Sequence, residues 1–549
     1  MEATKKPSLL TGALVGGMLM IALIALFFLA FRLLGLPFAP FDVIFPGIRD
    51  LTPGDLITFV IDTIVDLIGT FNLGRTDAAA KTIEQLMALG MTLGIGVVTG
   101  AVVFNLANRM KVKNRFLPGL WAGIILGVVM ILFFTASGLS VSADQFISAL
   151  WLFVAFVGFG VALSWIYYDL SVLRLPSEAA TGTQQGLDRR EFIVRVGGAT
   201  ATLTVLGTGL GALLEGTGQD AASSTIVIPE TTPQAVASTV TLSDATYVAD
   251  LEAAAGTRPE YTPLDDHYRI DISARPPALD ASSWRLRISG LVDAPVEMTL
   301  DEIINNFDPM EQLITMGCIS NRVGGDLIST TRWTGVRMQT LIDSWNLKPE
   351  ATHLRISSAD GFDEYVDLST IRDDDRVMLA YAWDGQALKQ KHGFPVRIYI
   401  PDHYGMKQPK WITDIEVVDS WDEGYWVRRG WSVTAFVQTT AVLDTVASSA
   451  VFERDGQQLV PVGGIAWAGA RGIAQVEVSV DEGEWQAAQL KTPQSELTWV
   501  IWRYDWPFAE GNHTFRVRCV DGTGTPQTES VQDVRPDGAT GIHSMRASL

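Results

Sequence analysis

The sequence predicts three successive parts: a helical membrane domain, a mixed α+β domain and a C-terminal β-sandwich. Residues 1–219 hold long apolar runs and carry 14 Lys and Arg against 14 Asp and Glu, whereas residues 220–549 carry 27 against 47. The whole formal charge of −20 therefore lies in the second part of the chain. Helical and strand patterns alternate over 264–430, and helix signals then vanish. We expect a lipid-embedded N-terminal part and an acidic remainder that binds neither nucleic acid nor an anionic membrane surface.

Five apolar runs in the N-terminal part are long enough to cross a bilayer. They extend approximately over residues 9–34, 86–107, 116–137, 146–168 and 196–214. A sixth run, Leu56 to Phe71, is short and carries Asp62 and Asp66. The basic residues between the runs lie on one side of the membrane only if five runs span and the sixth does not. We therefore expect about five transmembrane helices over 1–215, with residues 56–71 as an interfacial or re-entrant helix on the outer face. The basic residues are Lys5, Lys6, Arg109, Lys111, Lys113, Arg115, Arg174, Arg189, Arg190 and Arg195.

The last of the five runs resembles a twin-arginine export signal. Arg189 and Arg190 precede a moderately apolar stretch that is rich in Gly, Ala and Thr. The alternative is an ordinary basic flank of a membrane span. With either interpretation, the chain from Asp220 onward emerges on the extracytoplasmic side.

Two domains are expected in the soluble part, after a tether. Residues 216–263 are rich in Ala, Ser, Thr and Pro, which is typical of a tether. Short β-type runs alternate with helical patches over 264–430, which predicts the α+β domain. Over 431–549, strands are separated by Gly, Asp and Pro turns, which indicates an immunoglobulin-like β-sandwich. Phe515, Val517 and Cys519 lie on one face of a strand there, so Cys519 is expected in its core.

The tract from Leu313 to Val336 holds Cys318, one of only two cysteines in the chain. Cys318 follows a short apolar run and precedes a polar loop that contains Asn321 and Arg322. A thiol presented where a strand opens into a loop is a candidate ligand or nucleophile. The alternative is a buried, inert cysteine. The glycines and hydrogen-bonding groups that follow suit a backbone wrapped around a polar ligand.

This tract is similar to the cysteine loop of the sulfite oxidase family of molybdenum enzymes. Two further stretches, residues 379–388 and 392–417, fall in the order and approximate spacing of the family, and residues 277–290 resemble the first strand of the same domain. The resemblance covers roughly residues 260 to 540 and excludes the membrane part. It implies a molybdopterin cofactor whose molybdenum is bound by the Cys318 thiolate, and a sulfite-oxidase-type catalytic domain over 264–430.

The resemblance also implies roles for other residues. Tyr381 matches the active-site tyrosine of the family, and its alternative role is a core aromatic. The cations after His392 would be explained by an anion such as the cofactor phosphate, or else they are solvated charges at a strand end. The cofactor-binding candidates are Asn321, Arg322, Asp360, His392, Arg397, Lys407 and Lys410, and the catalytic candidates are Tyr381, Arg269 and Arg503.

The substrate pocket departs from the pattern of the sulfite-oxidising members, which surround the metal with several arginines. Val323 follows Arg322 here, and the upstream arginine position aligns with Asp271 or, with a shift, with Arg269. Arg503 would preserve one contributor. Each missing cation costs a charge-assisted bond of about 1.5–3 kcal/mol. Sulfite is therefore not the favoured substrate.

All six histidines follow residue 260 and no Cys-x-x-Cys-His occurs, so we expect neither haem nor an iron–sulfur cluster in this chain. A zinc site is also not expected. Electrons must then pass to a separate carrier, either a cytochrome or a quinone-reactive or haem-bearing membrane subunit. The other expected partners are a small-molecule substrate, membrane lipid and a second copy of the chain bound through the C-terminal domain.

These expectations combine into a multi-pass protein of the cell membrane with an extracytoplasmic catalytic domain. Export of a domain already folded around a cofactor made in the cytoplasm favours the twin-arginine interpretation. The expected function is that of a molybdopterin-dependent oxidoreductase that transfers an oxygen atom to or from a small substrate. Two alternatives stay open: a sulfoxide reductase of the same family, and a non-enzymatic binding module that has lost the cofactor.

Overall fold

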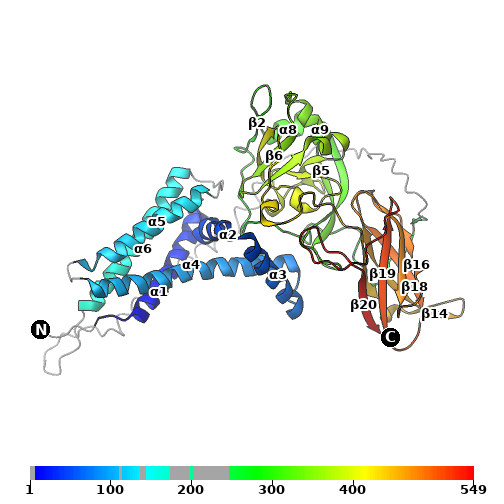
Figure 1. The fold of residues 1–549 in the computed structure, drawn as a ribbon, viewed down its shortest axis with the longest axis horizontal. Coiled ribbons are helices and arrows are strands. Elements are labelled where there is room, and N and C mark those ends of the chain that lie inside the picture. Colours follow the sequence, from blue (N-terminus) through cyan, green and yellow to red (C-terminus); the bar gives the residue numbers. More distant parts are fainter. Residues whose placement is uncertain (1–5, 111–113, 137–143, 173–196, 199–200, 202–246) are drawn as a thin grey trace.

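Four long apolar helices form most of the N-terminal part (Figure 1). They are α1 (Leu9–Leu34), α4 (Thr76–Arg109), α5 (Leu117–Ala136) and α6 (Gln145–Val172). Each is long and apolar enough to cross a membrane. The computed structural model describes residues 6–110, 114–136, 144–172, 197–198, 201 and 247–549. Four of the five expected apolar runs therefore form helices of the expected kind, whereas the fifth, with its twin-arginine flank, lies almost entirely outside the described residues.

Shorter helices connect α1 to α4. A π-helical turn, η1 (Pro40–Ile44), leads into α2 (Phe45–Leu51), and α3 (Gly54–Phe71) follows. The helix expected over residues 56–71 is thus present as α3, which starts after Pro53 and ends at Asn72 in a left-handed conformation. Only Thr58 and Ile68 of its 18 residues are buried. Its position relative to a membrane stays a prediction.

Glycines let α1 and α4 pack closely. Gly12 and Gly16 of α1 face Gly96 and Gly100 of α4, and a Cβ atom on Gly100 would overlap the carbonyl oxygen of Gly12. Small residues at helix crossings bring the backbones together and strengthen van der Waals contact, which is how helices associate where both surfaces are apolar. The crossing fixes the direction in which α4 projects toward the rest of the molecule.

Two sheets form the α+β domain, as expected, one of them antiparallel and the other mixed through the parallel pair β2 and β11. One sheet has the order β10-β8-β5-β4, with β9 on β8, and the other has the order β3-β2-β11-β6-β7. Their apolar faces and three short helices enclose a core that includes Trp345, Ile356 and Ile415. The strands are β2 (Leu286–Gly290), β3 (Val296–Met298), β4 (Pro309–Gly317), β5 (Ile328–Arg337), β6 (His353–Ser358), β7 (Asp363–Asp367), β8 (Met378–Trp383), β9 (Gln386–Ala387), β10 (Arg397–Tyr399) and β11 (Ile412–Val418), and the helices are α8 (Leu300–Asn306), α9 (Met338–Asp343) and α10 (Leu368–Asp373).

The C-terminal domain is built from two sheets that share one core. The sheet orders are β1-β17-β18-β14-β12, with β13 on β14, and β16-β15-β19-β20. Trp502, Phe515 and Cys519 lie in the core between them, so Cys519 is buried as expected. The strands are β1 (Tyr247–Val248), β12 (Thr440–Val446), β13 (Phe452–Arg454), β14 (Gln457–Trp467), β15 (Ile473–Val480), β16 (Gln486–Ala487), β17 (Gln489–Lys491), β18 (Val500–Pro507), β19 (Asn512–Asp521) and β20 (His543–Ser548).

The end of the expected tether belongs to this domain. Strand β1 pairs in parallel with β17, and the Tyr247 hydroxyl donates to the carbonyl of Ile473 at 2.6 Å. Arg258 pairs with Asp444 of β12 at 2.7 Å. Strand pairing, a hydrogen bond and an ion pair thus hold residues 247–258 on the C-terminal domain. Residues 216–246 lie outside the described part of the chain.

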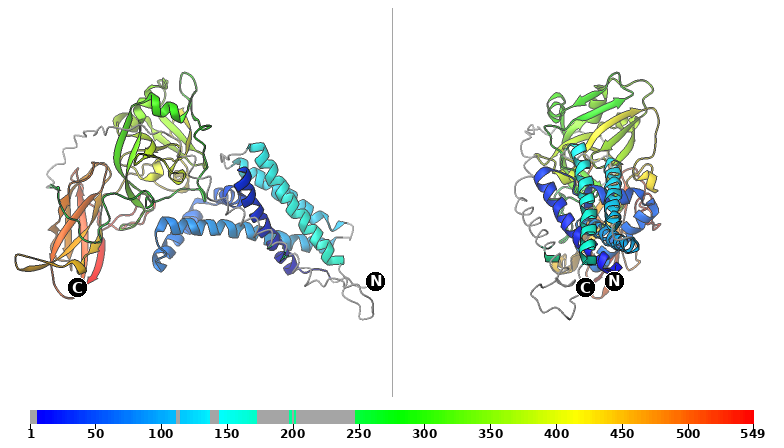
Figure 2. Two further views of the ribbon diagram at one scale, coloured as in Figure 1. Left: turned by 180° about the vertical axis from the view of Figure 1, so that it is seen from behind. Right: turned by 90° about the vertical axis from the view of Figure 1, so that its left-hand side faces the viewer.

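The helical part contacts the α+β domain through α2, α3 and the first turns of α4 (Figure 2). Lys81 of α4 donates to the carbonyl of Asp271 at 2.7 Å and to that of Ser273 at 3.0 Å. Gln85 donates to the carbonyl of Ala274 at 3.0 Å. The backbone of residues 271–274 therefore lies along the polar first turns of α4. This contact brings the helices to the edge of the site described next.

Candidate functional site

Cys318 lies at the end of β4, where the strand opens into a loop. Its backbone N–H donates to the carbonyl of Leu327 at 2.9 Å, and its own carbonyl accepts from the N–H of Asn321 at 3.0 Å. The side chain is 8% exposed, and its Sγ lies 3.0 Å from the Ser320 hydroxyl. Burial raises the pKa of the thiol. A thiolate at this position needs a positive partner, and a bound metal ion would supply one.

A cavity of about 430 Å³ opens at Cys318, between the α+β domain and the helical part. Small-molecule sites generally have volumes of about 300–1,000 Å³. The domain side of the wall includes Tyr268, Asp271, Cys318, His392, Arg397 and Lys410. The helical side includes Phe45, Leu56, Val60, Ile64, Lys81 and Met87. The cavity thus joins a polar end at the cysteine to an apolar wall made by α2, α3 and α4.

Two buried histidines in the wall carry ring nitrogens that have no partner. The rings of His267 and His392 lie 5.2 Å apart between centroids, and the Nε2 atom of each is buried without a hydrogen bond to any described residue. Burial lowers the pKa of His267 to about 3 and that of His392 well below its ordinary value, so both rings are neutral. Buried polar atoms are rarely left unpaired in folded proteins. These two nitrogens are suited to hydrogen-bond a ligand.

Arg397 is a buried cation with no carboxylate partner among the described residues. Its guanidinium donates to the carbonyl of His392 at 3.2 Å and lies 5.0 Å from the centre of the Trp333 ring. Burial lowers its pKa to about 10. An uncompensated charge in a low-dielectric interior is costly, and a bound anion would remove that cost.

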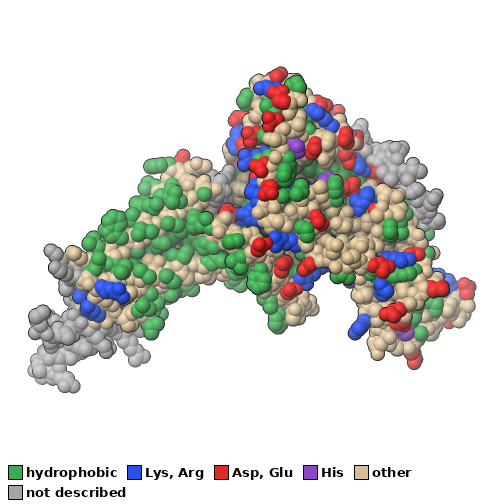
Figure 3. Space-filling model, in the orientation of Figure 1, with side chains coloured by type: hydrophobic (Ala, Val, Ile, Leu, Met, Phe, Trp, Pro, Cys, Tyr) green, Lys and Arg blue, Asp and Glu red, His purple; other side chains and the backbone are tan. Residues whose placement is uncertain are grey.

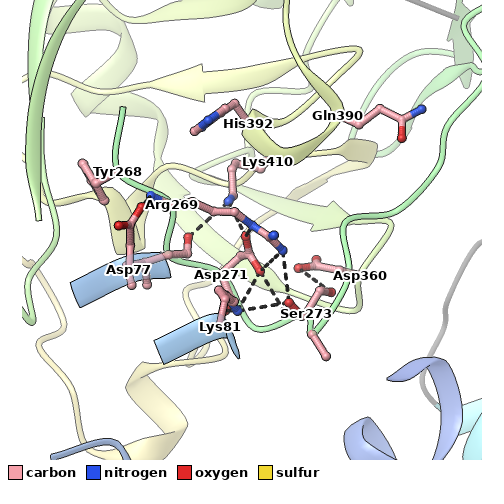
Figure 4. A network of polar contacts seen from close by, with 12 residues as sticks. Asp77, Lys81, Tyr268, Arg269, Asp271, Ser273, Asp360, Gln390, His392 and Lys410 are labelled. Carbon is pink, nitrogen blue, oxygen red and sulfur yellow. Dashed lines mark hydrogen bonds and ion pairs between the residues drawn. The ribbon is translucent and has the colours of Figure 1, made fainter. Parts of the chain in front are cut away.

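The Asp271 carboxylate collects three cations at the border with the helices (Figure 4). It accepts from Arg269 at 2.8 Å, Lys410 at 2.9 Å and Lys81 at 3.1 Å. Burial opposes the charged form, yet the three cations hold the pKa of Asp271 well below its ordinary value. Arg269 and Lys410 are therefore already paired within the protein. This pairing reduces the positive charge that the cavity can offer to an anionic substrate.

Asp360 lies next to this network, and its side chain accepts from the Ser273 hydroxyl at 3.5 Å. Burial and the neighbouring Asp271 carboxylate raise the pKa of Asp360 from 3.8 to about 6. Its neutral form is thus favoured by folding, and the corresponding stability is present below pH 3.8 and is lost as the pH rises through about 6.

The apoprotein is therefore expected to lose up to about 3 kcal/mol of stability from Asp360 between about pH 4 and pH 8. Asp360→Asn keeps a neutral side chain of the same shape and should remove this loss. We expect the variant to unfold at a higher temperature than the unsubstituted protein at about pH 8, with a smaller difference at about pH 4. An identical pH profile of thermal unfolding in both proteins would contradict the assignment.

The structure brings only some of the other expected residues to the cavity. Tyr381 lies on β8 in the main core of the α+β domain, and Arg503 lies on β18 of the C-terminal domain, paired with Asp505 at 2.7 Å. Neither of them lines the cavity. Lys407 is buried and pairs with Glu364 at 2.9 Å, so its charge is already compensated.

Asn321 and Arg322 lie on the other side of the cysteine. Together with Cys318 they line a second, smaller cavity of about 40 Å³. The Asn321 side chain accepts from the N–H of Leu327 at 3.0 Å, which closes the loop. Arg322 pairs with Asp66 of α3 at 2.6 Å. These two residues therefore shape the cysteine loop rather than the wall of the main cavity.

Several wall residues carry no signal in the sequence. His267, Tyr268, Lys81 and Trp431 line the cavity but belong to segments that lie far from the cysteine tract along the chain. Tyr268 packs in the same apolar cluster as Cys318. Only the position of His267 and Tyr268, directly before the candidate Arg269, could have pointed to this segment.

Comparisons with known proteins agree with this geometry. Residues 273–426 match the family described as the oxidoreductase molybdopterin binding domain, and residues 430–535 match the Mo-co oxidoreductase dimerisation domain. Mitochondrial sulfite oxidase of Homo sapiens is 27% identical over 317 residues, which cover 50% of this chain and 57% of that protein. Nitrate reductase [NAD(P)H] of Hordeum vulgare is 26% identical over 331 residues, which cover 49% of this chain and 37% of that protein.

A solved structure is also similar. The sulfane dehydrogenase SoxCD from Paracoccus pantotrophus has a TM-score of 0.46 and 20% identity, over 55% of this chain and 87% of that chain. The chain spans a little over half the length of the sulfite oxidases that it matches. The family matches cover the cysteine loop, the cavity wall from residue 273 and the C-terminal sheets. Residues 273–426 and 430–535 are therefore similar to the molybdopterin binding domain and the dimerisation domain of the sulfite oxidase family.

Proposed function

We propose that this protein is a membrane-anchored, molybdopterin-dependent oxidoreductase that transfers an oxygen atom to or from a small substrate on the extracytoplasmic side. One observation carries the proposal: the buried Cys318 thiol shares a cavity with Arg397, a buried cation that lacks a carboxylate partner in the described residues. A thiolate ligand and an anion site are what a molybdopterin cofactor requires of a protein.

The residues at the polar end fit the cofactor. Cys318 would hold the metal, and the free Nε2 atoms of His267 and His392 would hydrogen-bond polar groups of the pterin. Arg397 would bind its phosphate, assisted by Lys410 from the same side of the cavity. The bound cofactor supplies oxygen-atom exchange and a store for two electrons, while the protein sets orientation, electrostatics and access. Asn321 would keep the cysteine loop in place through its bond to Leu327.

The charge of the cavity supports a substrate other than the sulfite dianion. Arg269 is paired with Asp271, and Arg503 lies in the C-terminal domain away from the cavity wall. The part of the wall contributed by the helices is apolar apart from a few residues. A neutral sulfur compound, as reductant or as sulfoxide, meets less desolvation cost there than a dianion.

The direct test is substrate-driven oxidation or reduction of the purified protein. We expect about one molybdenum per chain by metal analysis, as a single thiolate ligand implies. Anaerobic mixing of the oxidised protein with reduced sulfur compounds, and of the reduced protein with sulfoxides, is then followed by optical and electron paramagnetic resonance spectroscopy. Spectral change in the first mixture favours an oxidase, and change in the second favours a sulfoxide reductase. A folded protein without molybdenum would support the non-enzymatic alternative instead.

The proposed topology puts the amino terminus and Arg109 in the cytoplasm and the C-terminal domains outside. Helix α4 has 34 residues, which at about 1.5 Å per residue is longer than the hydrocarbon core of a bilayer, about 30 Å thick. Its first turns hold the soluble domain through Lys81, whereas Lys6 donates to the carbonyl of Asn108 at its other end. Figure 3 shows basic side chains at that far end of an otherwise apolar surface. The positive-inside rule puts the basic end of α4 in the cytoplasm and its other end, with the soluble domain, outside.

Reporter fusions test this topology. A reporter placed after Lys113 and one placed after Leu549 should give opposite signals, one cytoplasmic and one external. Equal signals at the two positions would contradict an extracytoplasmic catalytic domain.

A homodimer is proposed through residues 430–535, on the strength of the match to a dimerisation domain. We expect a molar mass of two chains in detergent, measured by light scattering with the detergent contribution subtracted. A single-chain mass at micromolar concentration would remove this proposal.

A further inference from the structure

The helical wall of the cavity is apolar over three helices. Phe45 and Ile48 of α2, together with Met87 and Met91 of α4, line it. The remaining apolar contributors come from α3, and they are Leu56, Ile57, Val60, Ile61, Ile64 and Val65. Their spacing of three and four residues puts them on one side of that helix. A face of α3 thus closes the cavity from the membrane part of the protein.

The opposite side of α3 is largely polar, and two of its carboxylates, Asp55 and Asp66, pair with Arg535 and Arg322. Phe59 is 66% exposed and Leu67 is 45% exposed, and neither lines the cavity. Helix α3 is therefore amphipathic, with its apolar side toward the cavity and its carboxylates on the other side. Figure 3 shows hydrophobic side chains continuing along the helical part up to the α+β domain. The apolar surface of the helical part therefore reaches the domain border at which the cavity lies.

The other end of the cavity carries groups that exchange protons. Lys81, Glu84, Asp271, Asp360 and Lys410 all line it. Lys81 pairs with Glu84 at 2.8 Å as well as with Asp271. An occupant therefore meets an apolar wall along its length and hydrogen-bond donors at one end. A small polar anion gains nothing from the first feature, whereas a compact head with two oxygen acceptors and an apolar tail uses both.

We propose that the cavity binds a membrane quinone, with its head group beside Lys81 and its tail along α3. This inference rests on the proposed oxygen-transfer function. For an oxidase, one substrate molecule, one water and one quinone give the oxygenated substrate and one quinol. Water supplies the oxygen atom, and its two hydrogens and the two electrons released end on the quinone. For a sulfoxide reductase, the same balance runs in reverse.

A bound quinone would also serve as the separate electron carrier that this chain requires. All six histidines of the chain follow residue 260, so the helices cannot hold a haem between paired imidazoles. A carrier that binds in the same cavity as the proposed cofactor, beside Lys81, requires no such relay. Because a quinone takes two electrons with two protons, the lysines and carboxylates at the polar end become proton donors and acceptors for it.

The test measures quinone binding by the full-length protein in lipid nanodiscs free of endogenous quinone. Ile64→Trp fills the cavity from α3, and Phe59→Trp adds the same side chain on the exposed side of the same helix. We expect saturable binding of decylubiquinone that is weakened about tenfold or more by Ile64→Trp and changed less than about twofold by Phe59→Trp. A photoreactive azidoquinone should label peptides from residues 45–91.

Three results would overturn the inference: no saturable binding, equal weakening by both substitutions, or displacement of decylubiquinone by decylbenzene at equal affinity, which would mean that the head group is not recognised. The outcome for the proposed function is separate. Turnover of the unsubstituted protein with ferricyanide but not with decylubiquinone would remove the quinone site and leave the oxidoreductase. Binding of the quinone to a protein that lacks molybdenum would remove the proposed oxidoreductase function and leave the quinone site.

Discussion

Cys318→Ser is expected to abolish molybdenum binding and turnover while leaving the protein folded. A serine oxygen is a harder and far less acidic donor than a thiol, so it replaces a thiolate ligand poorly. The fold should tolerate the change, since the new hydroxyl can hydrogen-bond the Ser320 hydroxyl that now lies 3.0 Å from Sγ. We expect the stability of the apoprotein to change by no more than about 1 kcal/mol. Metal analysis, turnover and thermal unfolding of the same preparation check the three expectations.

The second cysteine of the chain provides a matched control. Cys519 is 1% exposed and lies in the core between the two sheets of the C-terminal domain. Cys519→Ala should lower stability by about 1–2 kcal/mol because a buried side chain becomes smaller, with molybdenum content unchanged. If Cys318→Ser retained both metal and activity, the central role of that thiol in the proposed function would be lost.

The cysteine tract and the later histidine stretch carried the prediction of the site. Cys318, His392, Arg397 and Lys410 do line one cavity. Cys318 directly follows β4 and Arg397 begins β10, whereas His392 and Lys410 lie in the segments that flank β10 and β11. The two motifs are separated in the chain, but their order matches the family. A resemblance that includes several motifs in order thus predicts spatial proximity that no single motif could.

The orientation of Tyr381 could not be predicted from the residues around it in the sequence. Every residue of β8 is buried, so the strand has no polar face from which to tell which side chains point toward the site. Arg503 is a different case. Residues two apart on a strand share a face, and its partner Asp505 follows at that spacing. This pairing holds the Arg503 guanidinium on β18, outside the cavity wall.

The apolar wall of the cavity could not be predicted from hydropathy. The expected run over 86–107 is the apolar part of α4, which begins at Thr76. The first turns of α4, which the expected run did not include, contain Lys81 and Gln85. The partners of these two side chains are backbone carbonyls about 190 residues later in the chain. Only tertiary packing brings these segments together. The function of α3 as a wall likewise depends on contacts that its own sequence does not reveal.

Arg397→Met should lower the retention of the cofactor without destabilising the apoprotein. Arg397 is 6% exposed and lacks a carboxylate partner among the described residues. An apolar side chain of similar length removes an uncompensated buried charge, so the apoprotein should be as stable as before or more stable. The holoprotein loses a charge-assisted bond to the cofactor, worth about 1.5–3 kcal/mol, which corresponds to a decrease in affinity of about tenfold to a hundredfold.

The effect of Arg397→Met on the stability of the apoprotein and of the holoprotein distinguishes a role in cofactor binding from a structural role. Arg376 is the control, because its guanidinium pairs with Asp374 at 2.7 Å and with Glu496 at 2.8 Å. Arg376→Met leaves these carboxylates unpaired and should destabilise the apo and holo forms alike, by about 1–3 kcal/mol. Thermal unfolding of both forms, together with molybdenum and pterin content, measures the difference. If Arg397→Met destabilised the apoprotein as much as the holoprotein, the arginine would serve the fold, and the anion site at the end of the cavity would have to be sought at Lys410.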